Sequence, residues 1–146
     1  MFEITIDEND VTIKKVGLFR VRNDDMNFSK FKKALAKSWD KDTAYHKDAP
    51  KWTSENPALG QCAITALLFN EYFGGKIFSG VSETGIVHYW NRIFGIKVDL
   101  TKQQFQSNLI FKNITVWNRN DLLETGNVAE RYNILKQRML ENYKKL

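Results

Sequence analysis

The 146-residue chain predicts a single α+β domain in which a buried helix packs on an antiparallel sheet. Three observations predict this class. Residues 63–73 are apolar on almost every side, as expected of a helix packed on several sides. Strand-like runs separated by Gly follow between residues 76 and 117. A chain of this length has room for one hydrophobic core.

The first 26 residues predict an added N-terminal β-hairpin. Ile4 and Ile6 alternate with polar residues, as do Val11 and Ile13, and residues 7–10 between them are of the kinds found in turns. Residues 18–21 are a candidate third strand. We therefore divide the single domain, residues 1–146, into a strand extension at 1–26 and a core at 27–146.

The core begins with a predicted amphipathic helix. Phe28, Phe31, Leu35 and Trp39 are spaced by three or four residues, so the helix begins near Asn27 or Ser29 and ends near residue 40. Both prolines then fall within residues 41–59, which predict an irregular loop. A loop of this length is often functional.

The loop leads to Cys62 and the buried helix, which Gly74-Gly75 ends. Strands are predicted at residues 76–79, 86–93, 96–100 and 114–117, with a short helical turn at 101–105. A final amphipathic helix is predicted to cover the sheet; its apolar positions are Val128, Tyr132, Leu135, Met139, Tyr143 and Leu146.

The charge pattern gives weak support to a nucleic-acid partner. The formal net charge is +5, and the basic residues gather on the two amphipathic helices. A solvated helix face explains them without a partner. They are Lys30, Lys32, Lys33 and Lys37 on the first helix, and Arg131, Lys136, Arg138, Lys144 and Lys145 on the last.

The sequence predicts a cytoplasmic protein with no membrane partner. A single cysteine excludes an internal disulfide and suits a reducing compartment. The N-terminus lacks the pattern of an export signal, and the longest apolar run is shorter than the ~18 residues that a membrane span needs.

Cys62 stands at the predicted start of the buried helix, where free N–H groups and the helix dipole stabilise a thiolate. A catalytic thiolate also needs an imidazole partner and a polar group that orients the ring. The chain has two histidines, His46 and His88. The alternative is that Cys62 only packs in the core, because a free cysteine in a protein most often behaves as a small buried hydrophobic residue.

His88 and Asp99 fall on the two arms of a predicted hairpin. A four-residue loop over residues 92–95 pairs Asn91 with Ile96 and puts His88 directly opposite Asp99. A two-residue loop makes them diagonal neighbours on one face, whereas a three-residue loop separates them onto opposite faces. Two of these three registers bring His88 to Asp99. Alternatively, each residue satisfies backbone groups in the core.

The chain resembles known proteins in two ways. The order of Cys, His and Asp is that of the papain-like and transglutaminase-like cysteine enzymes. His88-Tyr89-Trp90 followed by Asp99-Leu100-Thr101 resembles the core pattern of transglutaminase-like enzymes. Residues 34–138 resemble the small bacterial proteins of the YunG-like family, which implies a papain-like fold more strongly than any one reaction. The residues that carry this second resemblance are Ala34-Leu35, Ser38-Trp39, Trp52, Asn56-Pro57, Gly60-Gln61-Cys62, Thr65-Ala66-Leu67, Tyr72-Phe73-Gly74-Gly75, His88-Tyr89-Trp90-Asn91-Arg92, Val98-Asp99-Leu100-Thr101, Gln104-Phe105, Arg131-Tyr132 and Leu135-Lys136.

Four further residues are candidates for the site. Gln61 and Asn56 have amides that can donate to an oxyanion, although Asn56 also fits a turn before proline. Trp90 and Trp52 are candidates to line a substrate cleft or to pack in the core. No group of residues shows the ligand spacing of a metal site, so we expect no metal and no cofactor.

These observations lead to two hypotheses. The first is a cysteine-dependent acyl-transfer enzyme, an amide or isopeptide hydrolase or a transglutaminase-like enzyme, with Cys62 as nucleophile, His88 as general base and acid, and Asp99 as the residue that orients His88. Its partner is a peptide or protein substrate. The alternative is a catalytically inactive papain-like module that binds an acidic protein or a nucleic acid through the basic helices. Neither hypothesis fixes the oligomeric state.

Overall fold

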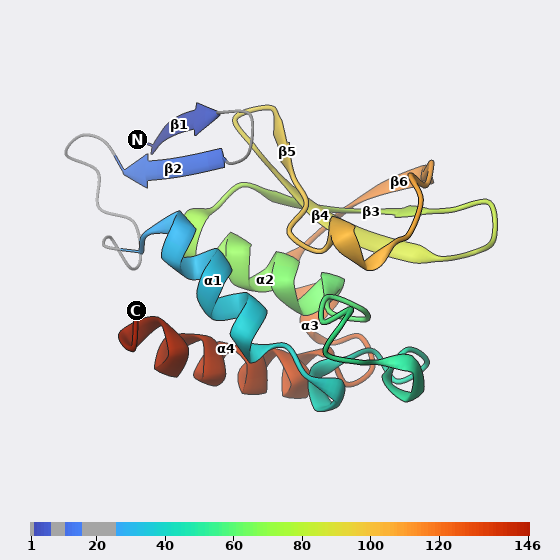
Figure 1. Cartoon of the computed structure of the whole chain (residues 1–146). Helices are drawn as coiled ribbons and strands as arrows, with labels where there is room; N and C mark the ends of the chain where they lie inside the picture. Colours follow the sequence, from blue (N-terminus) through green and yellow to red (C-terminus); the bar gives the residue numbers. More distant parts are fainter. Residues whose placement is uncertain (1, 7–10, 16–25) are drawn as a thin grey trace.

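The computed structural model describes residues 2–6, 11–15 and 26–146. These residues form an α+β fold with a two-stranded sheet and a four-stranded antiparallel sheet of order β5-β4-β3-β6 (Figure 1). The elements in chain order are β1 (Phe2–Ile6), β2 (Val11–Lys15), α1 (Phe28–Ser38), α2 (Cys62–Phe73), β3 (Lys76–Val81), β4 (Val87–Ile93), β5 (Ile96–Val98), β6 (Lys112–Trp117), α3 (Arg119–Leu123) and α4 (Val128–Lys144).

The N-terminal strands confirm the predicted hairpin. β1 and β2 pair antiparallel, with Ile4 opposite Ile13 and Ile6 opposite Val11. They form a sheet of their own and do not extend the four-stranded sheet. The predicted turn at residues 7–10 and the candidate third strand at 18–21 lie outside the described residues. The division of the domain at residue 26 stays a prediction.

The first amphipathic helix is also confirmed. Asn27 caps α1, because its side-chain oxygen accepts a hydrogen bond of 2.9 Å from the backbone N–H of Lys30. The apolar side chains of Phe28, Phe31 and Leu35 are buried. The long segment after α1 has two short 3-10 turns, at Lys41–Thr43 and Ala49–Lys51, and is otherwise irregular, as predicted.

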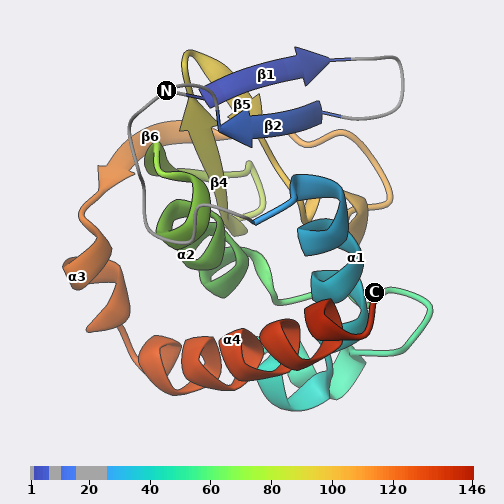
Figure 2. The ribbon, with the colours of Figure 1, turned by 90° about the vertical axis from the view of Figure 1, so that its left-hand side faces the viewer.

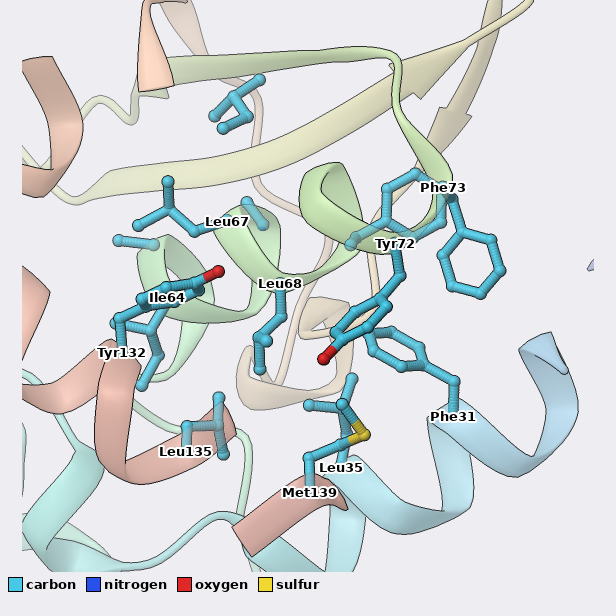
Figure 3. Packing of buried hydrophobic residues seen from close by; sticks show 14 of the residues in the cluster. Phe31, Leu35, Ile64, Leu67, Leu68, Tyr72, Phe73, Tyr132, Leu135 and Met139 are labelled. Carbon is cyan, nitrogen blue, oxygen red and sulfur yellow. The ribbon is translucent and has the colours of Figure 1, made fainter. Parts of the chain in front are cut away.

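Helix α2 lies at the centre of the molecule, between the four-stranded sheet and the helices α1 and α4 (Figures 1 and 2). Nine of its twelve residues are buried, which explains why its sequence is apolar on almost every side. In Figure 3, Leu68 points toward the layer of α1 and α4, and Tyr72 lies near Phe31 of α1. Gly74 ends the helix at φ 84°, a backbone conformation that glycine adopts readily.

The C-terminal helix does not cover the sheet, so that prediction is wrong. α4 packs on α1 and α2, and its buried residues Tyr132, Leu135 and Met139 face those helices (Figure 3). Helix α2 already packs against the sheet. Because α2 is also apolar on its other side, α4 packs there. Leu146 lies beyond the end of α4 and is exposed.

The hairpin of β4 and β5 corrects the predicted register. Asn91 pairs with Val98, and the loop has two residues, Phe94 and Gly95, with φ of 51° and 77°. The four-residue loop is therefore wrong, and the two-residue alternative is observed. Two consecutive residues with positive φ give a turn whose twist matches that of the strands it joins. Helix α3, which no sequence pattern predicted, follows β6 and buries Leu122.

Candidate active site

Cys62 is the first residue of α2 and is half-buried. The chain reaches it through Gly60, whose φ is +76° and whose position is so crowded that a Cβ atom there would lie 2.8 Å from the backbone nitrogen of Tyr45. The first hydrogen bond of the helix runs from the N–H of Thr65 to the carbonyl of Gln61. The N–H of Cys62 therefore belongs to the open, positive end of the helix dipole.

His88 lies on β4 with its side chain fully buried. Its Nε2 atom is 2.7 Å from Oδ2 of Asp99, just beyond the end of β5. The other carboxylate oxygen, Oδ1, accepts a hydrogen bond of 3.3 Å from the backbone N–H of Thr101. The two-residue turn thus makes His88 and Asp99 diagonal neighbours, and Thr101 fixes the carboxylate that holds the ring.

Three aromatic rings surround the imidazole of His88. The ring centroid of Phe105 lies 4.9 Å away in an edge-on arrangement, that of Phe111 lies 5.2 Å away, and that of Trp90 lies 5.9 Å away. These rings exclude water from the histidine. A water-poor setting strengthens the electrostatic interactions of the ring with its polar neighbours.

The pKa of His88 shows which neighbours matter. Burial alone lowers the pKa of an imidazole, but hydrogen bonds with Asp99 and Cys62 and their negative charges outweigh burial and raise the pKa of His88 to about 9. Cys62, at the start of α2, therefore lies close enough to the ring to influence the pKa of His88. Nε2 is bound to Asp99, so Nδ1 is the ring nitrogen that remains available for proton transfer. The structure brings Cys62, His88 and Asp99 together.

Gln104 also belongs to this site, although its place in the sequence predicted no role for it. It is buried at the end of a 3-10 turn, Lys102–Gln104, and its Nε2 atom lies 3.5 Å from Nδ1 of His88. The one signal in the sequence was that Gln104-Phe105 is part of the family resemblance.

The two amides predicted as oxyanion donors bind main-chain carbonyls. The Nε2 atom of Gln61 lies 3.0 Å from the carbonyl oxygen of Asp40 and 3.4 Å from that of Leu59. Asn56 donates to the carbonyl oxygen of Gln104 at 3.2 Å. The oxyanion role predicted for Gln61 would require its two bonds to rearrange, whereas Asn56 uses one of its two amide N–H groups in its bond to Gln104, so its role stays a prediction.

The two tryptophan candidates have packing contacts in the structure. The indole N–H of Trp52 donates to the carbonyl of Pro57 at 3.0 Å, so it holds the loop before α2. Trp90 is buried beside His88, and the ammonium group of Lys97 lies 4.5 Å from its ring centroid. Their predicted contact with a substrate stays a prediction.

A cavity of about 960 Å³ lies on the Asp99 side of the site. Its walls include Lys97, Lys102, Phe105 and Phe111, but neither Cys62 nor His88. This cavity is therefore not lined by the thiol or the imidazole. Within the described ranges, no group of three or more acidic, histidine or cysteine side chains is arranged to hold a metal ion.

Several basic residues predicted to lie on solvated helix faces are bound within the chain. Arg131 is buried and donates to the carbonyl oxygens of Thr43 at 3.0 Å and Gly60 at 3.4 Å. The prediction that Arg131 lies on a solvated face is wrong. The irregular loop between α1 and α2 turns these carbonyl oxygens toward the side chain, and buried carbonyls need a donor. Burial lowers the pKa of Arg131, and nearby charges, that of Cys62 first among them, oppose this effect. Two further basic residues of α4 form ion pairs, Lys136 with Glu71 and Arg138 with Asp42.

Comparison with known proteins places the chain in a family. The sequence model of the YunG protein family matches residues 27–144. The chain belongs to the YunG family. A relative named "Uncharacterized protein YunG", from Bacillus subtilis (strain 168), is 35% identical over 104 residues, which cover 70% of this chain and 83% of the relative. No solved structure matches the chain.

The family match agrees with the sequence resemblance over residues 34–138 and begins at residue 27, the first residue of the predicted core. It leaves the two-stranded sheet of β1 and β2 outside the shared region. In the part of the chain that the structure describes, no helix is both long and apolar enough to span a membrane.

Proposed function

We propose that this YunG-family protein is a cysteine-dependent acyl-transfer enzyme with a papain-like or transglutaminase-like core. One observation carries the proposal: the fully buried ring of His88 is bound at Nε2 by Asp99, and Cys62, at the open end of α2, lies close enough to the ring to help raise the pKa of His88. A nucleophile, a base within reach and a group that orients the base are the parts that such catalysis requires.

In the first step, the proton of the Cys62 thiol passes to Nδ1 of His88, and the sulfur attacks the carbonyl carbon of an amide. The oxygen of that carbonyl gains a negative charge, which the N–H of Cys62 at the helix end is placed to stabilise. Asp99 keeps its charge and stabilises the imidazolium. Its role is to orient the ring and to offset the cost of burying that charge.

In the second step, the carbon–nitrogen bond of the amide breaks. The leaving amine takes the proton from Nδ1 of His88, and the acyl group stays on sulfur as a thioester. Neutral His88 then removes a proton from an acceptor, which attacks the thioester carbon and releases the thiol group of Cys62. Water as acceptor gives amide or isopeptide hydrolysis, whereas an amine gives transamidation. A peptide or protein supplies the amide in either case.

The binding-module hypothesis has less support. Arg131, Lys136 and Arg138 make up much of the basic set on α4, and all three are engaged within the chain. Residues engaged in this way are less available to phosphates or to an acidic partner.

Alkylation of Cys62 by iodoacetamide tests the proposed function. At about pH 6.5, a thiolate held by an imidazolium reacts at least about tenfold faster than the same cysteine in the urea-unfolded chain. We expect His88→Asn to remove that advantage. The matched control is His46→Asn, because His46 is exposed and should leave the rate unchanged. A native Cys62 that reacts more slowly than the unfolded chain would contradict the proposal.

A further inference from the structure

The side chain of Gln104 connects three segments that meet at the candidate active site. Its Oε1 atom accepts a hydrogen bond of 3.4 Å from the backbone N–H of Gly60, in the turn that leads to Cys62. Its Nε2 atom donates to the carbonyl oxygen of Thr101 at 3.1 Å and lies 3.5 Å from Nδ1 of His88. One buried amide thus contacts the approach to the thiol, the chain after Asp99, and the ring itself.

These contacts fix which end of the amide faces the histidine. If the amide of Gln104 were turned over, its oxygen would face the carbonyl oxygen of Thr101 and its nitrogen would face the N–H of Gly60. Both contacts would then be repulsive. The nitrogen, which carries only donors, therefore points at Nδ1 of His88.

We propose that Gln104 is a positioning residue, which holds Nδ1 of His88 toward the start of α2 and favours the ring form that has its proton on Nε2. The inference deepens the proposed function and rests on it. An N–H of Gln104 can donate to Nδ1 only while that atom has no proton. Asp99 binds the other ring nitrogen and favours the same arrangement. In its neutral form, the ring is thereby kept ready to accept a proton at Nδ1, as it does when the acceptor attacks the thioester.

This role has a consequence for the charged form of the ring. When Nδ1 gains a proton, it faces the N–H of Gln104, so the amide opposes the imidazolium and favours transfer of the proton to a leaving group. The titratable groups that face His88 are Asp99 and Cys62, and both favour the imidazolium. The aromatic side chains around the ring carry no charge. Gln104 is therefore a polar neighbour that acts in the opposite direction.

Nuclear magnetic resonance titration of His88 in the Gln104→Met variant tests the inference. Met has a similar length and no donor, so the neutral ring loses its partner and the pKa of His88 rises by about half a unit to one unit. A role in packing alone predicts no change in the pKa of His88, because Met fills a volume similar to that of Gln and keeps the ring buried. Exposed His46 is the internal reference, and Gln103→Met, at an exposed neighbouring position, is the control.

A pKa of His88 that stays constant or falls in Gln104→Met overturns the inference. If that variant does not fold, the nitrogen chemical shifts of the neutral His88 ring in the native protein, above about pH 10, show which ring nitrogen carries the proton. A proton on Nε2 agrees with a donor facing Nδ1, and a proton on Nδ1 overturns the inference. The titration needs no reactive thiol. Rapid alkylation of Cys62 without a response of His88 to Gln104 rejects only this inference, whereas slow alkylation rejects the proposed function.

Discussion

Asp99→Asn removes the carboxylate that offsets the burial of His88 and keeps the shape of the side chain. In the native protein, the ring has its Nε2 atom 2.7 Å from that carboxylate and has no exposed surface. Without the charge, burial is the largest influence left, and burial lowers the pKa of a histidine. We expect the pKa of His88 to fall by about two units in this variant.

The structure also sets the size of the effect on stability. The pKa of His88 is about 9 in the folded protein, against 6.5 for an ordinary histidine. One pKa unit corresponds to about 1.4 kcal/mol, so this difference is worth roughly 3 kcal/mol. Because the folded pKa is the higher one, this stabilisation is fully present below about pH 6.5 and is lost as the pH rises to about 9.

Urea unfolding across this pH range measures the effect. The free energy of unfolding of the native sequence should fall by up to about 3 kcal/mol between about pH 6.5 and pH 9, and that of Asp99→Asn by less than about 1 kcal/mol. Both sequences carry Cys62→Ser, so that a thiol coupled to His88 does not titrate in the same range, and comparing them cancels the titration of the remaining groups. Asp121→Asn, at an exposed position on α3, should keep the native slope. Equal slopes for Asp99→Asn and the native sequence would refute the reasoning.

Two further predictions concern the segment that leads to Cys62. Arg131→Met should lower the free energy of unfolding by about 2 kcal/mol in urea titrations, since it removes the donor to the buried carbonyl of Thr43 and leaves that of Gly60 with only the N–H of Tyr45. Arg138→Met, at an exposed ion pair, should cost less than about 1 kcal/mol. Equal costs would show that burial of Arg131 is unimportant. Gly60→Ala should lower the melting temperature more than Gly85→Ala, because both positions have positive φ but only Gly60 lacks room for a Cβ atom. A comparable loss at both positions would mean that backbone strain alone, without the crowding, accounts for the effect. In addition, slower alkylation of Cys62 in Gly60→Ala would link this turn to the site.

The sequence pattern alone was sufficient to predict the helices whose apolar residues lie at regular spacing along the chain. The spacing of Phe28, Phe31 and Leu35 predicted α1, and the all-round apolar sequence of α2 predicted its burial. The same reasoning placed Cys62 at the start of a helix. In each case the pattern along the chain determines which side is buried, and no partner needs to be known.

The predictions that were wrong or missing concern contacts between segments that are distant in the sequence. The apolar stripe of α4 shows that the helix has a buried side, but not whether a sheet or another helix covers it. Arg131 is buried because the loop between α1 and α2 presents carbonyl groups to it, which charge patterning does not reveal. The role of Gln104 likewise depends on a tertiary contact with His88. The hairpin register depended on loop length, which the positive φ of Phe94 and Gly95 decides.

Acetyl transfer from p-nitrophenyl acetate tests the central proposal most directly, because it requires no knowledge of the natural substrate. The sulfur of Cys62 takes the acetyl group and p-nitrophenolate leaves, so release of the coloured product and the mass of the modified peptide report the same step. We predict a rapid burst of one product per chain, with the acetyl group on Cys62, and no burst in Cys62→Ser or His88→Asn. Slow release without a burst, with acetyl groups on surface lysines and none on Cys62, would contradict it.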